Sequence, residues 1–249
     1  MTAAIGIARI VRPTLYAALA FNLIFLIQEL FLVLPKAFLP GVTPILFHNN
    51  HDWSSHHPMV ELFQGTGVLT ILIVGLGCAL ALRGDQRTAD SRLALWWIAL
   101  MGLALGLLQV ALLPINEKSD VARALNYLSL TGVARTALAV AAVVAIPIAC
   151  AVLVRRLPDR ATARTMAVSG LLAVPLILPF RIPREPIEVI APPLLVALIA
   201  GLCIVVEAQF WKPSGPALPA LRAPLWAPAL ALAGLLAIFQ LLLRPGISF

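Results

Sequence analysis

The sequence predicts an all-α integral membrane protein: a bundle of about seven transmembrane helices with a cytoplasmic N-terminus and an outside C-terminus. Of its 249 residues, 61% are hydrophobic and 12% are charged. A soluble domain is typically about 45–50% apolar and about 25% charged, so both values indicate a chain that is dissolved in lipid. The apolar residues also form continuous runs of roughly the 20 residues that a spanning helix needs.

Seven such runs follow one another in what we expect to be a single polytopic membrane domain, residues 1–249. Apolar and polar residues do not alternate within the runs, which excludes a transmembrane β-barrel. The fifth run is the shortest and contains Pro175 and Pro179, so we expect it to be kinked or only partly inserted. The predicted helices are 13–34, 59–82, 93–113, 129–154, 165–180, 189–211 and 225–243, and a histidine-rich outer loop is 35–58.

Lysine and arginine residues in the connections set the expected orientation, because cytoplasmic loops carry an excess of them. Placing the N-terminus inside puts eleven of these residues in the cytoplasm and six outside, and Arg135 within a predicted helix completes the 18. We therefore expect a multi-pass protein of the plasma membrane or the bacterial inner membrane. The basic residues lie in short clusters without interleaved aromatic residues, so the net charge of +7 indicates topology signals and no nucleic-acid partner.

Glycines at helical spacing predict close packing between the second and third apolar segments. Gly102 and Gly106 form a GxxxG pattern in the third segment, and Gly75 and Gly77 are among four glycines that thin the second. Small residues let two helix backbones approach each other inside a membrane.

Histidine occurs only in the predicted outer loop, between residues 48 and 57. Imidazole nitrogens and carboxylate oxygens are ligands that suit zinc, and a catalytic zinc site usually has three protein ligands and one open position. We therefore predict a divalent-metal site, with zinc as the candidate ion. The predicted metal ligands are His48, His51, Asp52 and His57.

Two glutamates lie near the outer ends of the first two helices and are the predicted catalytic residues. A carboxylate within a membrane is costly unless it is paired, protonated or bound to a cation, so Glu29 and Glu61 favour a common site with the histidines. If the second helix starts at Pro58, capped by Ser55, then His57 and Glu61 lie on one helical face. A metal would acidify its bound water, and either glutamate would carry the proton.

Further polar residues fall at the same predicted depth, near the outer ends of the helices. We interpret the stretch 116–120 as a solvated turn, Trp53 as an interfacial anchor, and Trp96 and Trp97 as anchors at the opposite interface. The remaining candidate site residues of the outer half are Gln28, Gln64, Gln109 and Arg135.

These features support three readings of function. The first is a metal-dependent, hydrolase-like enzyme that acts on a membrane lipid or another apolar substrate. In general design it resembles the seven-helix membrane hydrolases with a histidine–aspartate zinc site, although here all four histidines come from one loop. The second is a transporter or permease subunit. The third is a non-catalytic membrane subunit or proton sensor that uses the histidine-rich loop. The sequence leaves the oligomeric state open.

The predicted orientation can be tested with an impermeant thiol reagent. A cysteine at Ser119 should react when the reagent is applied from outside, because that residue lies in a predicted outer connection. A cysteine at Thr88 should not react. The opposite labelling pattern would place the histidine-rich loop in the cytoplasm.

Overall fold

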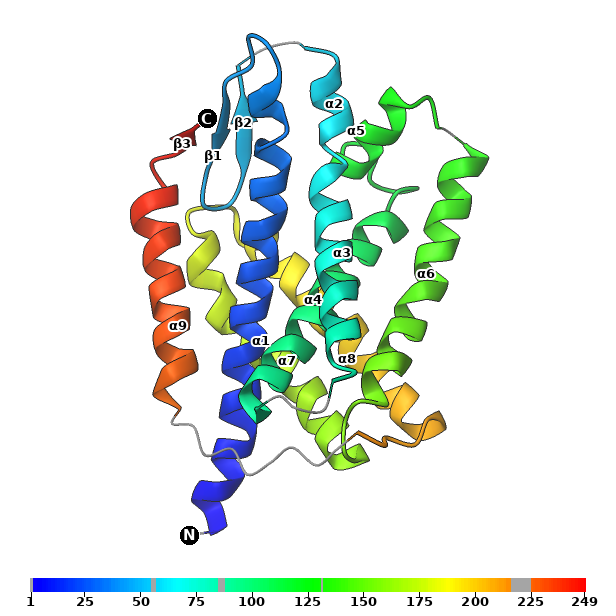
Figure 1. The fold of residues 1–249 in the computed structure, drawn as a ribbon, viewed down its shortest axis with the longest axis vertical. Coiled ribbons are helices and arrows are strands. Elements are labelled where there is room, and N and C mark those ends of the chain that lie inside the picture. Colours follow the sequence, from blue (N-terminus) through cyan, green and yellow to red (C-terminus); the bar gives the residue numbers. More distant parts are fainter. Residues whose placement is uncertain (1, 55–56, 85–87, 131, 216–224) are drawn as a thin grey trace.

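The computed structural model describes residues 2–54, 57–84, 88–130, 132–215 and 225–249. This part of the chain is mostly helical and holds seven segments that are long and apolar enough to cross a membrane, which confirms that prediction (Figure 1). The two termini lie at opposite ends of the bundle, as an odd number of crossings requires. The seven segments are α1 (Thr2–Val33), α2 (Met59–Phe63) with α3 (Thr66–Ala81), α4 (Ala89–Ala111), α6 (Val133–Val154), α7 (Arg160–Arg181), α8 (Pro186–Phe210), and α9 (Trp226–Ala237) with the π-helix η2 (Ile238–Leu243).

The fifth apolar segment, α7, is a complete helix that contains both Pro175 and Pro179. It begins five residues before the predicted start, because the Asp159 carboxylate accepts a hydrogen bond from the Thr162 N–H at 2.6 Å and caps the helix. With 22 residues, α7 is long enough to cross a membrane, so the expectation of a partial crossing is not supported.

The predicted outer loop is in fact partly ordered as a small antiparallel sheet. Its strands are β1 (Pro44–Leu46), β2 (His51–Trp53) and the C-terminal β3 (Ile247–Ser248), in the order β2-β1-β3. The first two form a β-hairpin, in which the Phe47 N–H donates to the Asn50 carbonyl at 2.8 Å. The hairpin, the short helix η1 (Lys36–Phe38) and helix α5 (Asp120–Tyr127) lie at one end of the bundle, which we call the hairpin end (Figure 1).

Gly246 lets the chain turn from η2 into β3. Its φ of +91° is a conformation that only glycine adopts readily. A Cβ atom at this position would also lie 2.6 Å from the Phe47 ring. The C-terminal strand therefore reaches β1 only because residue 246 has no side chain.

Helix α1 packs against α3, α4, α7 and α9 and carries much of the buried surface. Trp96 and Trp97 on α4 are 2% and 1% exposed, so the expectation that they anchor the protein at an interface was wrong. The Trp96 indole donates to the Leu153 carbonyl of α6 at 3.0 Å, and its ring meets that of Trp97 edge to face. These two side chains join helices inside the bundle.

A partly buried ion pair joins α1 to α4 at the end opposite the hairpin. The Arg12 guanidinium donates to an Asp90 carboxylate oxygen at 2.9 Å, and the Tyr16 hydroxyl donates to the same oxygen at 3.2 Å. The Thr88 hydroxyl caps α4 by accepting from the Ser91 N–H, which places Asp90 inside the helix. The sequence predicted that this helix starts at residue 93. That start left Asp90 outside the helix, so its pairing with Arg12 was not predicted.

Helices α3 and α4 cross at the glycines that predicted close packing. A Cβ atom at Gly75 would lie 2.8 Å from the Leu103 backbone nitrogen, and one at Gly102 would lie 2.7 Å from the Ile71 carbonyl oxygen. A side chain at either position would therefore push the two backbones apart. Gly77, on the same helix as Gly75, has no such neighbour within 4 Å.

We expect Gly75→Ala to destabilise the protein by about 1–3 kcal/mol, because overpacking forces the helix backbones to move. Gly77→Ala is the matched control on α3 and should change little. Thermal unfolding in detergent measures both variants. Equal melting temperatures for the two variants would contradict the close approach of α3 and α4.

Candidate functional site

A buried histidine at the hairpin end bridges two side chains from the helices. His51 Nδ1 lies 2.8 Å from Glu29 Oε2 on α1, and His51 Nε2 lies 3.0 Å from Gln64 Oε1 at the end of α2. All three residues are buried: His51 is 9% exposed, Glu29 is 6% exposed and Gln64 is 1% exposed. We call this group the Glu29–His51–Gln64 triad.

The strand alternation of β2 decides which side chains reach the triad. Neighbouring residues of a strand point to opposite faces, so His51 and Trp53 share one face while Asp52 takes the other. The rings of His51 and Trp53 stack, with centroids 5.8 Å apart and an interplanar angle of 20°. Asp52 is exposed, and its carboxylate accepts a hydrogen bond from the Trp53 N–H at 2.8 Å. The predicted metal ligands Asp52 and His51 therefore diverge.

Gln64 completes the triad in place of the predicted Glu61. Gln64 caps the C-terminal end of α2, at the break before α3, and its side chain is turned into the bundle. Glu61 is half-buried in the first turn of α2. Glu29 and Glu61 therefore lie near the same end of the bundle, as predicted, but His51 is bonded to Glu29 and Gln64.

Lys36 is a fully buried cation beside the triad. It is 0% exposed, and its Nζ atom lies 4.2 Å from the centroid of the Trp53 ring, in cation–π geometry. Within the described part of the chain, this nitrogen has no hydrogen-bond partner. Three carboxylates lie within electrostatic reach of it, namely Asp120, Glu29 and Glu61. The sequence identified Lys36 only as one of the charges outside the membrane.

Asp120 approaches the same group from α5. Ser119 caps this helix by accepting from the Ala122 N–H, which fixes Asp120 as the first helical residue. Burial raises the pKa of the Asp120 carboxyl, and Glu29 acts in the same direction, whereas His51, Lys36 and Arg123 lower it. The predicted solvated turn at 116–120 thus ends at Asp120, a carboxyl whose pKa is affected by the charges of Glu29 and His51.

His48 and Asn49 form a second attachment of the hairpin to the bundle. His48 Nε2 donates to the Ile182 carbonyl at 3.1 Å, and the Asn49 amide donates to the Arg181 carbonyl at 3.1 Å. Burial lowers the pKa of His48, and Arg244 and Arg184 lower it further, against the hydrogen bond to Ile182. The neutral ring is the form that fits this attachment.

The remaining predicted site residues make local or helix-to-helix contacts. His57 Nδ1 accepts from the Met59 N–H at 3.3 Å at the start of α2. Gln28 on α1 and Gln109 on α4 exchange two hydrogen bonds, of 3.2 and 2.9 Å. The Arg135 guanidinium donates to the carbonyls of Leu130 and Ala122 and to the side chain of Asn126, and so ties α6 to α5.

The predicted metal ligands do not converge. His48, His51 and His57 each bind a different partner, while Ser55 and His56 lie outside the described residues. Among the residues that the structure describes, no three histidine, cysteine, aspartate or glutamate side chains are placed to hold a metal ion. Among the described residues these donors are not gathered into a zinc site, so the metal site stays a prediction, and we base no chemistry on it.

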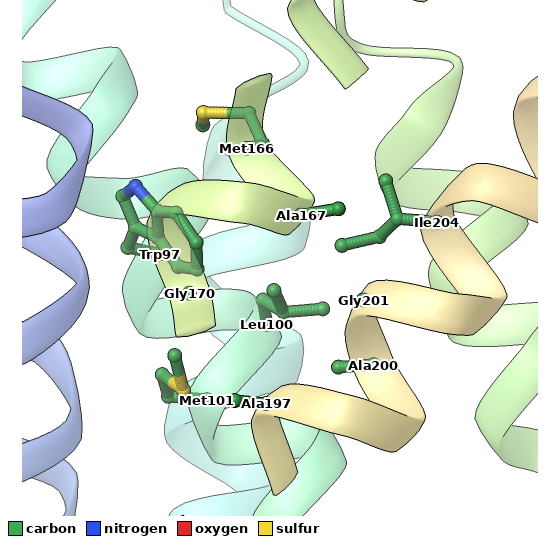
Figure 2. A pocket seen from close by; sticks show the side chains of 10 residues that line it. All are labelled: Trp97, Leu100, Met101, Met166, Ala167, Gly170, Ala197, Ala200, Gly201 and Ile204. Atoms are coloured by element: carbon green, nitrogen blue, oxygen red, sulfur yellow. The ribbon is translucent and has the colours of Figure 1, made fainter. Parts of the chain in front are cut away.

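A small apolar cavity lies away from the triad, between α4, α7 and α8. Figure 2 shows Trp97, Gly170 and Gly201 among the residues that line it. Its volume of about 10 Å³ has room for about one water molecule, whereas pockets for organic ligands are typically hundreds of Å³. We assign no ligand to this cavity.

No known protein family, no curated protein and no solved structure matches this chain. The functional argument therefore rests on the residues of the hairpin end.

The His48 attachment predicts sensitivity to acid. The folded state holds the pKa of His48 below its ordinary value of 6.5, so the unfolded chain binds more protons and stability falls as the pH drops through that range. His48→Gln keeps a donor for Ile182 but cannot be protonated. It should lose less thermal stability than the wild type between about pH 8 and pH 5. An equal loss of stability in the wild type and in His48→Gln would contradict the assignment of the acid sensitivity to His48. His57→Gln is the control variant.

Proposed function

We propose that this chain is a proton-responsive multi-pass membrane protein, in which the Glu29–His51–Gln64 triad exchanges a proton and controls how the hairpin docks on the helix bundle. One observation carries the proposal: both ring nitrogens of a buried histidine are hydrogen-bonded, one to a carboxylate and one to an amide. Histidine is the side chain that ordinarily changes charge between about pH 5 and pH 8.

The triad can hold His51 in both of its protonation states. As arranged, both ring nitrogens face oxygen atoms, which suits the doubly protonated ring because each nitrogen then donates. Rotation of the Gln64 carboxamide by half a turn presents its NH₂ group to Nε2, and the neutral ring accepts from it. The Nδ1–H bond to Glu29 is kept in both states. A proton can therefore bind or leave without moving the ring.

Protonation changes the strength of the docking contact. A charged His51 forms an ion pair with Glu29, which adds the attraction between opposite charges to the hydrogen bond. Loss of the proton leaves the hydrogen bond to the buried carboxylate without that attraction. Deprotonation of His51 thus weakens the contact of β2 with α1. Protonation of His48 weakens the contact of the hairpin turn with the end of α7.

Charged groups on every element around the triad join this response. The charge of His51 lowers the pKa of the Asp120 carboxyl, so a proton on His51 also acts on Asp120. The charged and titratable neighbours are Lys36 on η1, Glu61 on α2, Asp120 and Arg123 on α5, and Arg181 at the end of α7.

The proposal favours the proton-sensor reading over the hydrolase reading. The two nitrogens of His51 that would bind a metal are both engaged by Glu29 and Gln64. Seven apolar helices support a membrane location, and the basic residues of the connections favour the plasma or bacterial inner membrane with the hairpin end outside. In that orientation the triad would respond to the external pH.

Trp53 offers a direct readout, because a protonated imidazole quenches the fluorescence of an indole stacked on it. The fluorescence of the full-length protein in lipid nanodiscs should change in a single transition between about pH 5 and pH 8. His51→Gln should abolish the transition. Glu29→Gln should move its midpoint to lower pH, because the protonated ring loses its negative partner.

Two controls identify the source of the signal. Trp53→Phe should remove the transition while leaving the helical circular dichroism unchanged, and His57→Gln should leave it in place. A wild-type protein without a transition, or one whose transition survives His51→Gln, would refute the proposed proton site.

A further inference from the structure

The end of the bundle opposite the hairpin carries a concentration of positive charge. It lies where the turn between α6 and α7 meets the end of α8 (Figure 1). Only two acidic side chains, Asp159 and Glu207, occur in the same described segments, 154–164 and 207–215. We call the group of cations the basic patch: Arg155, Arg156, Arg160, Arg164 and Lys212.

The basic patch is held in place by backbone contacts between its two segments. The Gly215 N–H donates to the Leu157 carbonyl at 2.9 Å, and the Ser214 N–H donates to the Arg155 carbonyl at 3.4 Å. The Arg160 guanidinium donates to the Gln209 carbonyl at the end of α8, at 3.1 Å. Gly215 lies so close to Arg156 that a Cβ atom there would meet the Arg156 carbonyl oxygen. The cations therefore sit on a preformed surface.

An aromatic residue fixes one of these cations. The Arg155 guanidinium lies 3.8 Å from the centroid of the Trp211 ring. Tryptophan is enriched where membrane helices meet the headgroup layer. Stacking leaves the guanidinium edge free to donate, and that edge matches the oxygen atoms of a phosphate group.

Apolar side chains lie next to the basic patch on the same two helices. Val152 on α6 and Val206 and Phe210 on α8 are 44%, 41% and 78% exposed. Helices α6 and α8 pack against each other, so these exposed apolar side chains lie on neighbouring helices, within about two turns of the cations. A soluble phosphate would use only the cations, whereas a phospholipid would use these apolar side chains as well.

We propose that the basic patch binds the headgroup of an anionic phospholipid, with the acyl chains lying against the exposed surface of α6 and α8. The phosphate is recognised by Arg155 and Arg160, which are fixed by Trp211 and Gln209, while Arg164 and Lys212 add charge at the rim. A zwitterionic lipid offers the same chains but no net charge. The patch therefore selects lipids by the charge of the headgroup.

Native mass spectrometry of the full chain in an uncharged detergent tests this. The probes are dioctanoyl phosphatidylglycerol, dioctanoyl phosphatidylcholine and inorganic phosphate. The double variant Arg164→Gln with Lys212→Gln removes two exposed charges of the patch. Lys118→Gln with Arg184→Gln removes the same charges at the hairpin end and is the matched control.

We expect the wild type and the control to bind phosphatidylglycerol at least about tenfold more tightly than phosphatidylcholine. The patch variant should lose about tenfold in affinity for phosphatidylglycerol and keep its melting temperature. Equal binding of the two lipids, or an equal loss in the patch and control variants, would overturn the proposal. Inorganic phosphate that binds as tightly as phosphatidylglycerol would also overturn it, because the acyl chains would then contribute nothing.

Discussion

The hydrogen bond between Glu29 and His51 is the contact on which the hairpin end depends. A carboxylate buried in an apolar bundle is costly unless it is paired, and His51 Nδ1, at 2.8 Å, is its hydrogen-bonding partner in the described structure. The strand that carries His51 brings Trp53 with it, and Trp53 covers the buried amine of Lys36. One pairing thus places a carboxylate, an imidazole, an indole and a lysine amine in a single group.

The hairpin itself has little stability of its own. Its strands are three residues long, and an isolated two-stranded hairpin is marginally stable at best in water. The hairpin is held on the bundle by the triad at β2, by His48 and Asn49 at the turn, and by pairing of β1 with β3. Two of these three attachments contain a histidine, so the docking of a weak element is linked to proton binding. The gain or loss of one proton, which would move little in a rigid core, can therefore change how the hairpin docks.

The sequence predicted the helices well and the site only in part, for physical reasons. A membrane forces each backbone polar group to bond within its own helix, so apolar length alone identified seven segments. The cost of a buried carboxylate likewise singled out Glu29. The partner of His51 could not be predicted, because it depends on the break between α2 and α3, which turns Gln64 inward while Glu61 stays half-buried. Asp120 was missed because its burial comes from the way α5 packs on α2.

The central claim, that the Glu29–His51 bond docks the hairpin, is tested most directly by a double-mutant cycle. Glu29→Leu, His51→Leu and the double variant are compared by hydrogen exchange of the amides of residues 45–53, which gives the free energy of opening of the hairpin. We predict a coupling of about 1.5–3 kcal/mol, the usual value for a hydrogen bond to a charged group. Additive effects of the two substitutions, with a coupling near zero, would contradict the account.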